Sequence, residues 1–447
     1  MSRGLLERVC ATDVSEPALI WRDRRCTYGF LLDEAEKIGR MLVDADVPRG
    51  GVVSLEGDYS PRAAAAFLAL LAHEAIAVPL GPDASDRQEL RRRAEVEVRL
   101  KLEAGDQIVA IQTGVTAGHS FYRKLRCAGH PGLVLFSSGS DGRPKAAVHD
   151  FACLGARYKR PGRASRICAF LTIDHIGGLN TLLYTLANGG CLVVPGGRSP
   201  AEVCQTIESE RVEVLPTTPT FLNLLLLSGA CERFDLSSLA LITYGTEVMP
   251  TPTLRRLREW LPQVRLMQTY GLSETGILAT RSLEDGSVWF AITAPDVETR
   301  IVAGVLHVRA PTTMLGYLDG RSERMLADGW FDTGDLVESR GDFIRVLGRA
   351  GDLINVGGNK VQPAEVENVI LELDGVAEAR VSGETNALTG HHVRLEVVLV
   401  TAETSAEFSQ RLRRHCSDRL EPFKIPQRVI VADRPLHGQR YKKVRTR

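Results

Sequence analysis

The sequence predicts an α/β protein with a large N-terminal domain of helix-flanked sheets and a smaller C-terminal domain. Helix-like and strand-like segments alternate along most of the chain, which is typical of layered architectures with largely buried sheets. The chain has 447 residues, more than one hydrophobic core usually organises. Glycines punctuate residues 348–352, so we expect domains over residues 1–348 and 349–447.

The expected elements follow from two periodicities. Short apolar runs bounded by turn residues indicate strands, and longer runs of mixed polarity indicate helices. In the N-terminal domain we expect helices over residues 33–43 and 63–73, and strands over 52–56, 76–79, 132–136, 191–195, 239–243, 299–302 and 306–310. In the C-terminal domain we expect helices over 364–373 and 406–419, and strands over 377–381, 393–400 and 428–431.

The composition excludes several classes of protein. Lys plus Arg and Asp plus Glu each total 55, so net charge favours neither nucleic acid nor an anionic membrane as a partner. The nine cysteines form no CxxC pair, which argues against a disulfide framework or a structural zinc site. The N-terminus lacks the apolar core of a signal peptide, and the apolar run 63–72 is too short to cross a bilayer. We therefore expect a soluble, cytoplasmic protein.

One expected strand leads into a loop rich in hydroxyls and glycine. Glycine lets backbone N–H groups converge on phosphate oxygens, hydroxyls donate further hydrogen bonds, and a lysine adds positive charge. The spacing is not that of a Walker A loop, and the same composition is common in ordinary solvent loops. The candidate phosphate-binding residues are Ser137, Ser138, Gly139, Ser140, Asp141, Gly142 and Lys145.

A second segment, residues 268–275, joins an aromatic ring to a hydroxyl and a carboxylate. Tyr270 beside Gly271 could stack on an adenine. Ser273 and Glu274 could then meet an α-phosphate and its Mg²⁺, a cation that prefers oxygen ligands. The alternative is a helix N-terminus capped by Ser273.

Two further segments carry polar residues at glycine-rich turns. Asp335 follows an aromatic pair and a glycine, and could present its carboxylate to a ribose diol, although Asp and Gly are common in any tight turn. Arg349 lies in the glycine-punctuated segment, ahead of the pair Gly357–Gly358. The alternative for this region is a linker followed by a helix that starts at Pro363.

The order and spacing of these four segments resemble the adenylate-forming superfamily of acyl-CoA synthetases, amino-acid adenylation domains and luciferases. The resemblance covers nearly the whole chain, from residues 27–28 to residues 421–426 and the basic C-terminus. It implies a large N-terminal domain, a small mobile C-terminal domain and an active site between them. It also implies an AMP-forming acid–thiol ligase that uses ATP, Mg²⁺ and CoA.

The resemblance assigns roles residue by residue. Residues 137–145 match the loop that holds the β- and γ-phosphates. Tyr270 matches the aromatic ring that stacks on adenine, Ser273 the hydroxyl on the α-phosphate and Glu274 the Mg²⁺ ligand. Asp335 matches the ribose partner, with Arg349 assisting. The other expected nucleotide-binding residues are Gly245, Thr246 and Glu247, in the loop along the adenine, together with Gln268 and Gly271.

In such enzymes the acid's carboxylate attacks the α-phosphorus and pyrophosphate leaves. Catalysis then depends on positioning and on charge stabilisation by Mg²⁺ and a lysine. The resemblance places that lysine at Lys443, with Lys442 as the close competitor, although the usual preceding glycine is absent; a solvated basic tail is the alternative. The C-terminal domain rotates for thiol transfer, and the residues matched to the thiol tunnel are Gly357, Gly358, Asn359 and Lys360.

Two positions depart from the family pattern. Asp141 stands where the family usually has threonine, which puts a negative charge beside the phosphates. Gly351 occupies a hinge position often held by Asp or Lys, which should loosen the pivot. A third departure is in the tail, where the candidate lysine is not followed by the usual arginine at its expected place. Asp141 and this altered tail motivate an alternative to the ligase, a catalytically impaired nucleotide-binding protein.

Residues 172–178 resemble the acyl-pocket wall of CoA ligases. Ile176 stands where amino-acid-activating relatives carry an aspartate, which disfavours an α-amino acid substrate. The expected pocket residues indicate an apolar or aromatic acid and are His175, Gly177, Gly178, Leu272 and Gly276. The acceptor is expected to be the thiol of CoA, with the phosphopantetheine of a carrier protein as the alternative.

Overall fold

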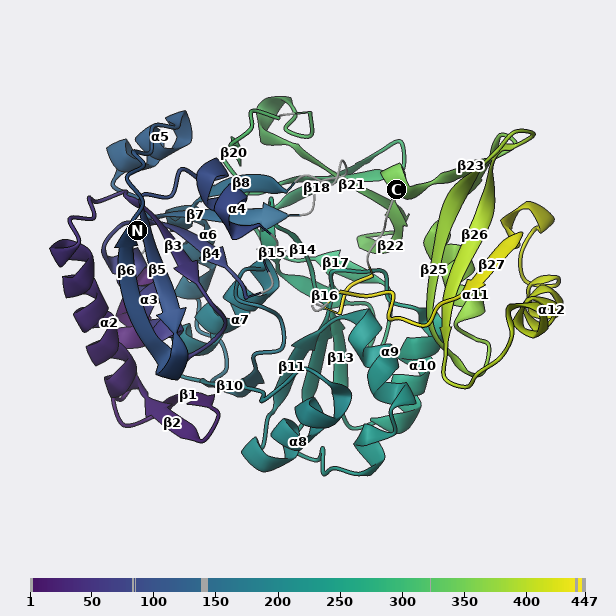
Figure 1. Cartoon of the computed structure of the whole chain (residues 1–447), viewed down its shortest axis with the longest axis horizontal. Coiled ribbons are helices and arrows are strands. Elements are labelled where there is room, and N and C mark those ends of the chain that lie inside the picture. Colours follow the sequence, from purple (N-terminus) through teal and green to yellow (C-terminus); the bar gives the residue numbers. More distant parts are fainter. Residues whose placement is uncertain are drawn as a thin grey trace.

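The computed structural model describes residues 3–82, 84, 86–137, 144–321, 323–438 and 441–443. Five sheets and their flanking helices form the large body and the smaller C-terminal unit seen in Figure 1. The predicted α/β class is confirmed. Among the described residues, no helix is both long and apolar enough to cross a lipid bilayer. All nine cysteines are unpaired.

Two seven-stranded mixed sheets form most of the body, and the second is parallel except for its edge strand β2. The first has the strand order β20-β8-β7-β4-β3-β5-β6. Its strands are β3 (Val52–Glu56), β4 (Ile76–Leu80), β5 (Val98–Glu103), β6 (Gln107–Gln112), β7 (Gly132–Ser137), β8 (Lys145–Asp150) and β20 (Gly316–Tyr317). The second has the order β13-β12-β11-β9-β10-β1-β2. Its strands are β1 (Pro17–Trp21), β2 (Arg24–Thr27), β9 (Arg166–Cys168), β10 (Cys191–Val194), β11 (Val214–Thr217), β12 (Leu241–Tyr244) and β13 (Arg265–Gln268).

Apolar helices cover both sheets. The largest core lies between the sheets and takes side chains from α2 (Tyr28–Asp44), α3 (Pro61–Ala72) and α7 (Ile176–Ala187). A second core packs the other side of the second sheet against α8 (Pro200–Glu210), α9 (Pro219–Leu227) and α10 (Thr251–Trp260). The remaining helices of the body are α1 (Arg3–Cys10), α4 (Arg87–Arg93), α5 (Ser120–Ala128) and α6 (Phe151–Leu154), which the 3₁₀ turn η2 (Gly155–Lys159) extends.

An antiparallel sheet and a short hairpin complete the body. The sheet has the order β16-β17-β22-β21-β19-β18. Its strands are β16 (Thr280–Ser282), β17 (Phe290–Ile292), β18 (Glu298–Val302), β19 (Val305–Arg309), β21 (Phe331–Arg340) and β22 (Phe343–Arg349). The hairpin pairs β14 (Tyr270–Leu272) with β15 (Gly276–Leu278).

The C-terminal unit has its own sheet and its own core. Strands β23 (Ile354–Val356), β24 (Asn359–Val361), β25 (Val376–Asn386), β26 (Gly390–Leu399) and β27 (Arg428–Val431) pack on α11 (Pro363–Ile370) and α12 (Ser405–Cys416). The core of this unit, built from residues after 353, supports the expected division near residue 348, which stays a prediction. In Figure 1 the yellow tail after β27 runs back toward α9 of the body.

Candidate functional site

The predicted phosphate loop joins two antiparallel neighbours of the first sheet. Ser137 ends β7 and is directly opposite Lys145, the first residue of β8. The loop residues Ser138, Gly139, Ser140, Asp141 and Gly142 lie outside the described residues. The Lys145 ammonium lies 5.5 Å from the ring centroid of Tyr317, on the adjacent strand β20. The pairing of β8 with β7 and β20 therefore places the Lys145 ammonium near the ring of Tyr317.

Tyr317 connects this hairpin to the predicted Mg²⁺ ligand. Its hydroxyl donates to Glu274 Oε1 at 2.6 Å, and Glu274 lies on the turn between β14 and β15. Burial and the nearby Glu274 charge raise the pKa of the Tyr317 hydroxyl, so that group stays a donor. The Met314 N–H donates to the Glu274 carbonyl at 2.7 Å, which fixes the turn. Nothing in the sequence around Tyr317 indicated this contact, because it depends on β20 pairing with β8.

A buried histidine supports the same turn. His149 is 0% exposed, and its Nε2 lies 2.6 Å from the backbone oxygen of Ser273. Burial lowers the pKa of His149, which favours the neutral ring. Ser273 caps no helix, because the chain reverses into β15 through Gly276, whose φ is +72°. The helix-cap alternative for residues 273–274 is therefore wrong.

Tyr270 and Asp335, both buried, meet the partly exposed Arg349 in one cluster. The Tyr270 hydroxyl donates to Asp335 Oδ2 at 2.6 Å, and Arg349 Nε lies 2.8 Å from Oδ1. Burial raises the pKa of Asp335, while the Arg349 charge and the Tyr270 hydrogen bond oppose that rise. Tyr270 is 7% exposed and stacks on Phe290 at 5.7 Å, so its use as the adenine platform stays a prediction.

Two other candidates, Gln268 and Gly271, lie close to Tyr270 in the sequence. Gln268 ends β13, is 5% exposed and accepts a hydrogen bond from Thr280 through its backbone oxygen. A Cβ at Gly271 would lie 2.5 Å from the Gly276 oxygen, so the close hairpin requires glycine there.

The expected adenine loop follows β12 and is in contact with the C-terminal tail. A Cβ at Gly245 would lie 2.7 Å from Thr269 Oγ1, so no larger residue fits without movement. Thr246 is exposed and has a φ of +72°. Glu247 Oε2 accepts the Thr220 hydroxyl at 2.6 Å, while Oε1 accepts the Lys443 N–H at 2.7 Å. Glu247 thus connects the loop after β12 with α9 and the tail.

The two candidate lysines of the tail have different environments. The Lys443 ammonium lies 2.7 Å from Glu367 Oε2 on α11, and the two side chains are 14% and 4% exposed. The Lys442 ammonium acts on the cluster of Tyr270, Asp335 and Arg349. Burial raises the pKa of Asp335, and Arg349, Tyr270, Arg324 and then Lys442 lower it.

An aromatic anchor holds the tail in place. The ring of Tyr441 lies 5.5 Å from that of Phe170 and 5.3 Å from that of Phe221, both in the body. On its other side Tyr441 stacks on His437 at 4.8 Å. His437 in turn lies 2.8 Å from Glu378 of the C-terminal sheet. The tail therefore touches both units.

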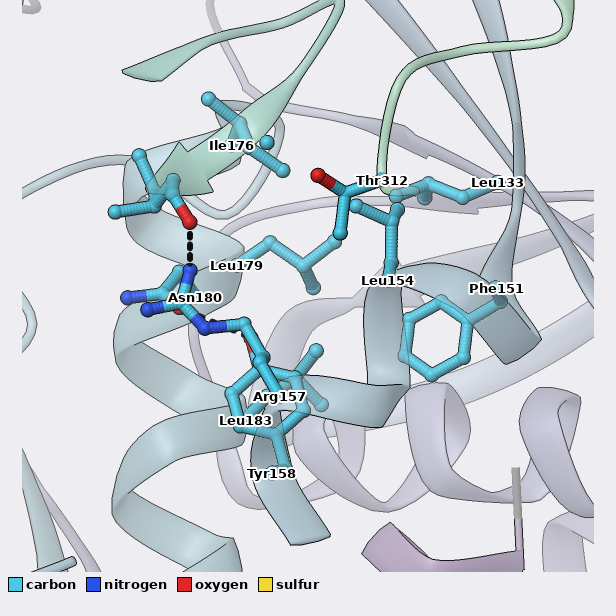
Figure 2. Close-up of a pocket in the computed structure, with 12 residues that line it drawn as sticks. Leu133, Phe151, Leu154, Arg157, Tyr158, Ile176, Leu179, Asn180, Leu183 and Thr312 are labelled. Atoms are coloured by element: carbon cyan, nitrogen blue, oxygen red, sulfur yellow. Dashed lines mark hydrogen bonds between the residues drawn. The ribbon is translucent and has the colours of Figure 1, made fainter. Parts of the chain in front are cut away.

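Figure 2 shows residues that line a mainly apolar cavity in the body. One face of α7 lines it with residues at helical spacing, and α6, η2 and β15 supply the other walls. The lining residues are Leu133, Phe151, Leu154, Arg157, Tyr158, Ile176, Leu179, Asn180, Leu183, Gly276, Ile277 and Thr312. Thr312 donates to the Thr275 carbonyl at 2.7 Å, which places one end of the cavity beside the turn that carries Glu274.

The structure places the predicted pocket residues at different sites. Gly276 lines the cavity. His175 caps α7, with Nδ1 accepting the Gly177 N–H at 3.1 Å. A Cβ at Gly178 would lie 1.9 Å from the Thr172 oxygen, so Gly178 permits α7 to pack closely against residues 171–172. Leu272 instead packs with Ala147, Met314, Tyr317 and Phe331 in a small core cluster.

The predicted thiol-tunnel residues form an exposed β-hairpin. Gly357 and Gly358 are its two turn residues, with φ of +56° and +90°, between β23 and β24. Asn359 and Lys360 begin β24, and all four residues are exposed. In this arrangement they form a surface of the C-terminal unit, so their role in a tunnel stays a prediction.

Comparison with known proteins supports the assignment of the fold. The profile described as AMP-binding enzyme matches residues 6–318, and the profile described as AMP-binding enzyme C-terminal domain matches residues 365–440. The crystal structure of an anthranilate CoA ligase in complex with anthranoyl-AMP superimposes with a TM-score of 0.84 at 21% identity, and covers 99% of this chain and 95% of that one.

Curated relatives carry ligase names. A 3-[(3aS,4S,7aS)-7a-methyl-1,5-dioxo-octahydro-1H-inden-4-yl]propanoyl:CoA ligase of Rhodococcus jostii is 31% identical over 323 residues, 67% of this chain and 61% of the relative. The chain thus spans about three fifths of that relative's length. An indoleacetate–CoA ligase of Aromatoleum aromaticum is 26% identical over 96% of this chain and 93% of the relative. Relatives named as acyl-carrier-protein ligases match as well. With both profiles matched in order, the chain belongs to the AMP-binding enzyme family.

Proposed function

We propose that this protein activates an apolar or aromatic carboxylic acid with ATP and passes the acyl group to the thiol of CoA. The observation that carries the proposal is the position of the cavity. Its Thr312 end adjoins the turn that holds Glu274, and Glu274 is joined through Tyr317 to Lys145. An acid in the cavity would therefore have its carboxylate close to the groups matched to ATP binding.

The chain's own residues fit the parts of this reaction. The acid's carboxylate oxygen attacks the α-phosphorus and pyrophosphate leaves, which builds negative charge that positioned cations stabilise. Lys145 and Lys443 would supply positive charge, and the Ser273 hydroxyl would donate to the α-phosphate. Asp335, held by Tyr270 and Arg349, would accept the ribose hydroxyls through the remaining lone pairs of its oxygens.

Mg²⁺ fits the donor set at the β14–β15 turn. Only Tyr317 among the described residues hydrogen-bonds to the Glu274 carboxylate, so oxygen lone pairs stay available for a hard cation. No group of three or more metal-ligating side chains occurs in the described part of the chain. Mg²⁺ usually binds nucleotides through one or two carboxylates together with the phosphates, and Glu274 would be such a carboxylate. When bound, the ion would neutralise charge on the phosphates.

The cavity and the relatives both favour an apolar or ring-containing acid. The walls consist mainly of Leu, Ile, Phe and Tyr side chains. Relatives are named for indoleacetate and for an indene-ring propanoyl acid. Ile176, which lines the cavity, stands where amino-acid-activating relatives carry the aspartate that pairs with an α-ammonium group. We therefore propose that the substrate lacks an α-amino group.

The acceptor is proposed to be CoA. The exposed Gly357–Gly358 hairpin could reach the body after a rotation of the C-terminal unit about residues 348–352. A carrier protein offers the same pantetheine arm, and several relatives are named as carrier-protein ligases. This second acceptor is tested by the same experiment.

The test is ATP–pyrophosphate exchange with a panel of aliphatic, aryl and arylalkyl acids. Exchange with at least one acid is expected, and Glu274→Gln should reduce it about 100-fold or more because the cation ligand is lost. Absence of exchange with every acid would support a binding protein without ligase activity. Thioester formation is then measured with CoA and with a phosphopantetheinylated carrier protein, and product with the carrier alone would overturn the CoA assignment.

A further inference from the structure

One end of the cavity carries polar side chains among apolar walls. Arg157 of η2 and Asn180 of α7 both line it, and Figure 2 draws them together on the side of the cavity away from Thr312. Tyr158 is 5% exposed, whereas Arg157 is half-buried. A guanidinium beside so much hydrocarbon is costly unless its N–H groups find acceptors.

The hydrogen bonds at this end leave donors available and few acceptors. Arg157 Nη1 donates to the Ile277 carbonyl, and no carboxylate of the described residues forms an ion pair with Arg157. The Tyr158 hydroxyl donates to Asn180 Oδ1 at 3.0 Å, which uses one lone pair of the amide oxygen. The guanidinium keeps further N–H donors, and the amide keeps two.

We propose that the acid bound here carries a second oxygen acceptor, a carboxylate or a ketone, at the end remote from its reacting carboxylate. Arg157 is the residue that recognises this acceptor, through charge-assisted hydrogen bonds. The inference rests on the proposed function and narrows its substrate class. A plain apolar acid would fill the cavity but leave the Arg157 and Asn180 donors without acceptors, which costs affinity.

The geometry also defines the competing explanation, in which Arg157 is only a brace. It bonds the Ile277 carbonyl of β15 and lies 5.7 Å from the Tyr158 ring. A brace would hold β15 and Gly276 in place for every substrate alike. Recognition of an acceptor would instead affect only acids that carry one.

The experiment measures kcat/KM for ATP–pyrophosphate exchange with matched acids. The trio 3-phenylpropanoate, 3-(4-acetylphenyl)propanoate and 3-(4-carboxyphenyl)propanoate is run beside octanoate, 7-oxooctanoate and octanedioate. In the wild type, at least one acceptor-bearing acid should exceed its plain parent about 10-fold or more. Arg157→Met should lower kcat/KM about 10- to 100-fold for that acid and less than about 3-fold for its plain parent. Arg160→Met, an exposed arginine just after the same 3₁₀ turn, is the matched control and should change neither.

The outcomes separate this inference from the proposed function. Lack of exchange with every acid in the wild type is a failure of the ligase assignment. Two results overturn the role of Arg157. One is a higher kcat/KM for the plain parents in the wild type, and the other is an equal loss of kcat/KM for plain and acceptor-bearing acids in Arg157→Met. If Arg157→Met does not fold, Arg157→Lys decides the question. If Arg157→Lys keeps the wild-type Tm but prefers acceptor-bearing acids several-fold less, recognition by Arg157 is supported. An unchanged preference refutes it.

Discussion

Replacing Lys443 by alanine should affect stability and catalysis through two separate routes. The ammonium lies 2.7 Å from Glu367 Oε2, and that carboxylate is only 4% exposed. Removing one member of a buried ion pair costs about 3 kcal/mol, at the low end of the usual range because Lys443 keeps 14% exposure. Glu367 Oε1 also accepts the Val381 N–H at 3.0 Å, so the exchange of that amide reports on the same site.

The stability effect is measured by hydrogen exchange. A loss of about 3 kcal/mol corresponds to roughly 150-fold faster exchange of the Val381 amide by local opening. The double variant Lys443→Ala with Glu367→Gln removes the buried charge and keeps an acceptor for Val381, so most of the protection should return. Protection equal to wild type in Lys443→Ala alone would show that the ion pair is not stabilising.

The catalytic effect is measured by half-reactions. Adenylation should fall about 100- to 1,000-fold in both the single and the double variant, because both lack the ammonium that we propose stabilises the leaving pyrophosphate. Thioester formation from supplied acyl-adenylate should persist in the double variant. If the double variant recovers adenylation, the loss was structural. Lys442→Ala is the matched comparison: adenylation retained in Lys443→Ala and lost in Lys442→Ala would transfer the role to Lys442.

Three further predictions concern the site and its supports. Burial lowers the pKa of His149 in the folded protein, so the neutral ring contributes fully to stability above about pH 6.5, and this contribution is lost as pH falls through the lower folded pKa. The free energy of unfolding in urea should therefore change less between pH 7 and pH 5 in His149→Gln than in wild type. Tyr270→Phe deletes the hydrogen bond to the buried Asp335 and should cost about 1.5–3 kcal/mol, with weaker AMP binding by calorimetry; unchanged affinity would contradict a ribose role for this pair. Gly178→Ala would place its Cβ 1.9 Å from a backbone oxygen and should abolish activity or folding, whereas the control Gly39→Ala, with nothing within 4 Å, should be neutral or stabilising by circular dichroism melts.

Sequence reasoning predicts elements well where turn residues bound them. Strands β3 and β27 begin and end at the expected residues, 52–56 and 428–431. Helix α2 begins at Tyr28 rather than at residue 33, because Thr27 accepts the Phe30 N–H and caps the helix. The helix side of the cavity could also have been found, since residues 176, 179, 180 and 183 share one face of α7.

The missed site residues depend on contacts between distant segments. Tyr317 and His149 lie on neighbouring strands of the first sheet, and both reach the β14–β15 turn more than a hundred residues from His149. No local pattern distinguishes either side chain from an ordinary strand residue. Arg157 likewise lies in a short 3₁₀ turn without a motif, and only the packing of η2 against α7 and β15 brings it to the cavity.

The hydrogen bonds of the Glu247 carboxylate link the tail thermodynamically to the loop expected to bind adenine. One carboxylate binds both the Thr220 hydroxyl on α9 and the Lys443 N–H. A ligand that draws this carboxylate away weakens tail docking, and docking of the tail weakens that ligand's affinity by the same factor. If nucleotide is such a ligand, two measurements give the same coupling free energy. One is the change in tail docking when nucleotide binds, and the other is the change in nucleotide affinity when the tail docks.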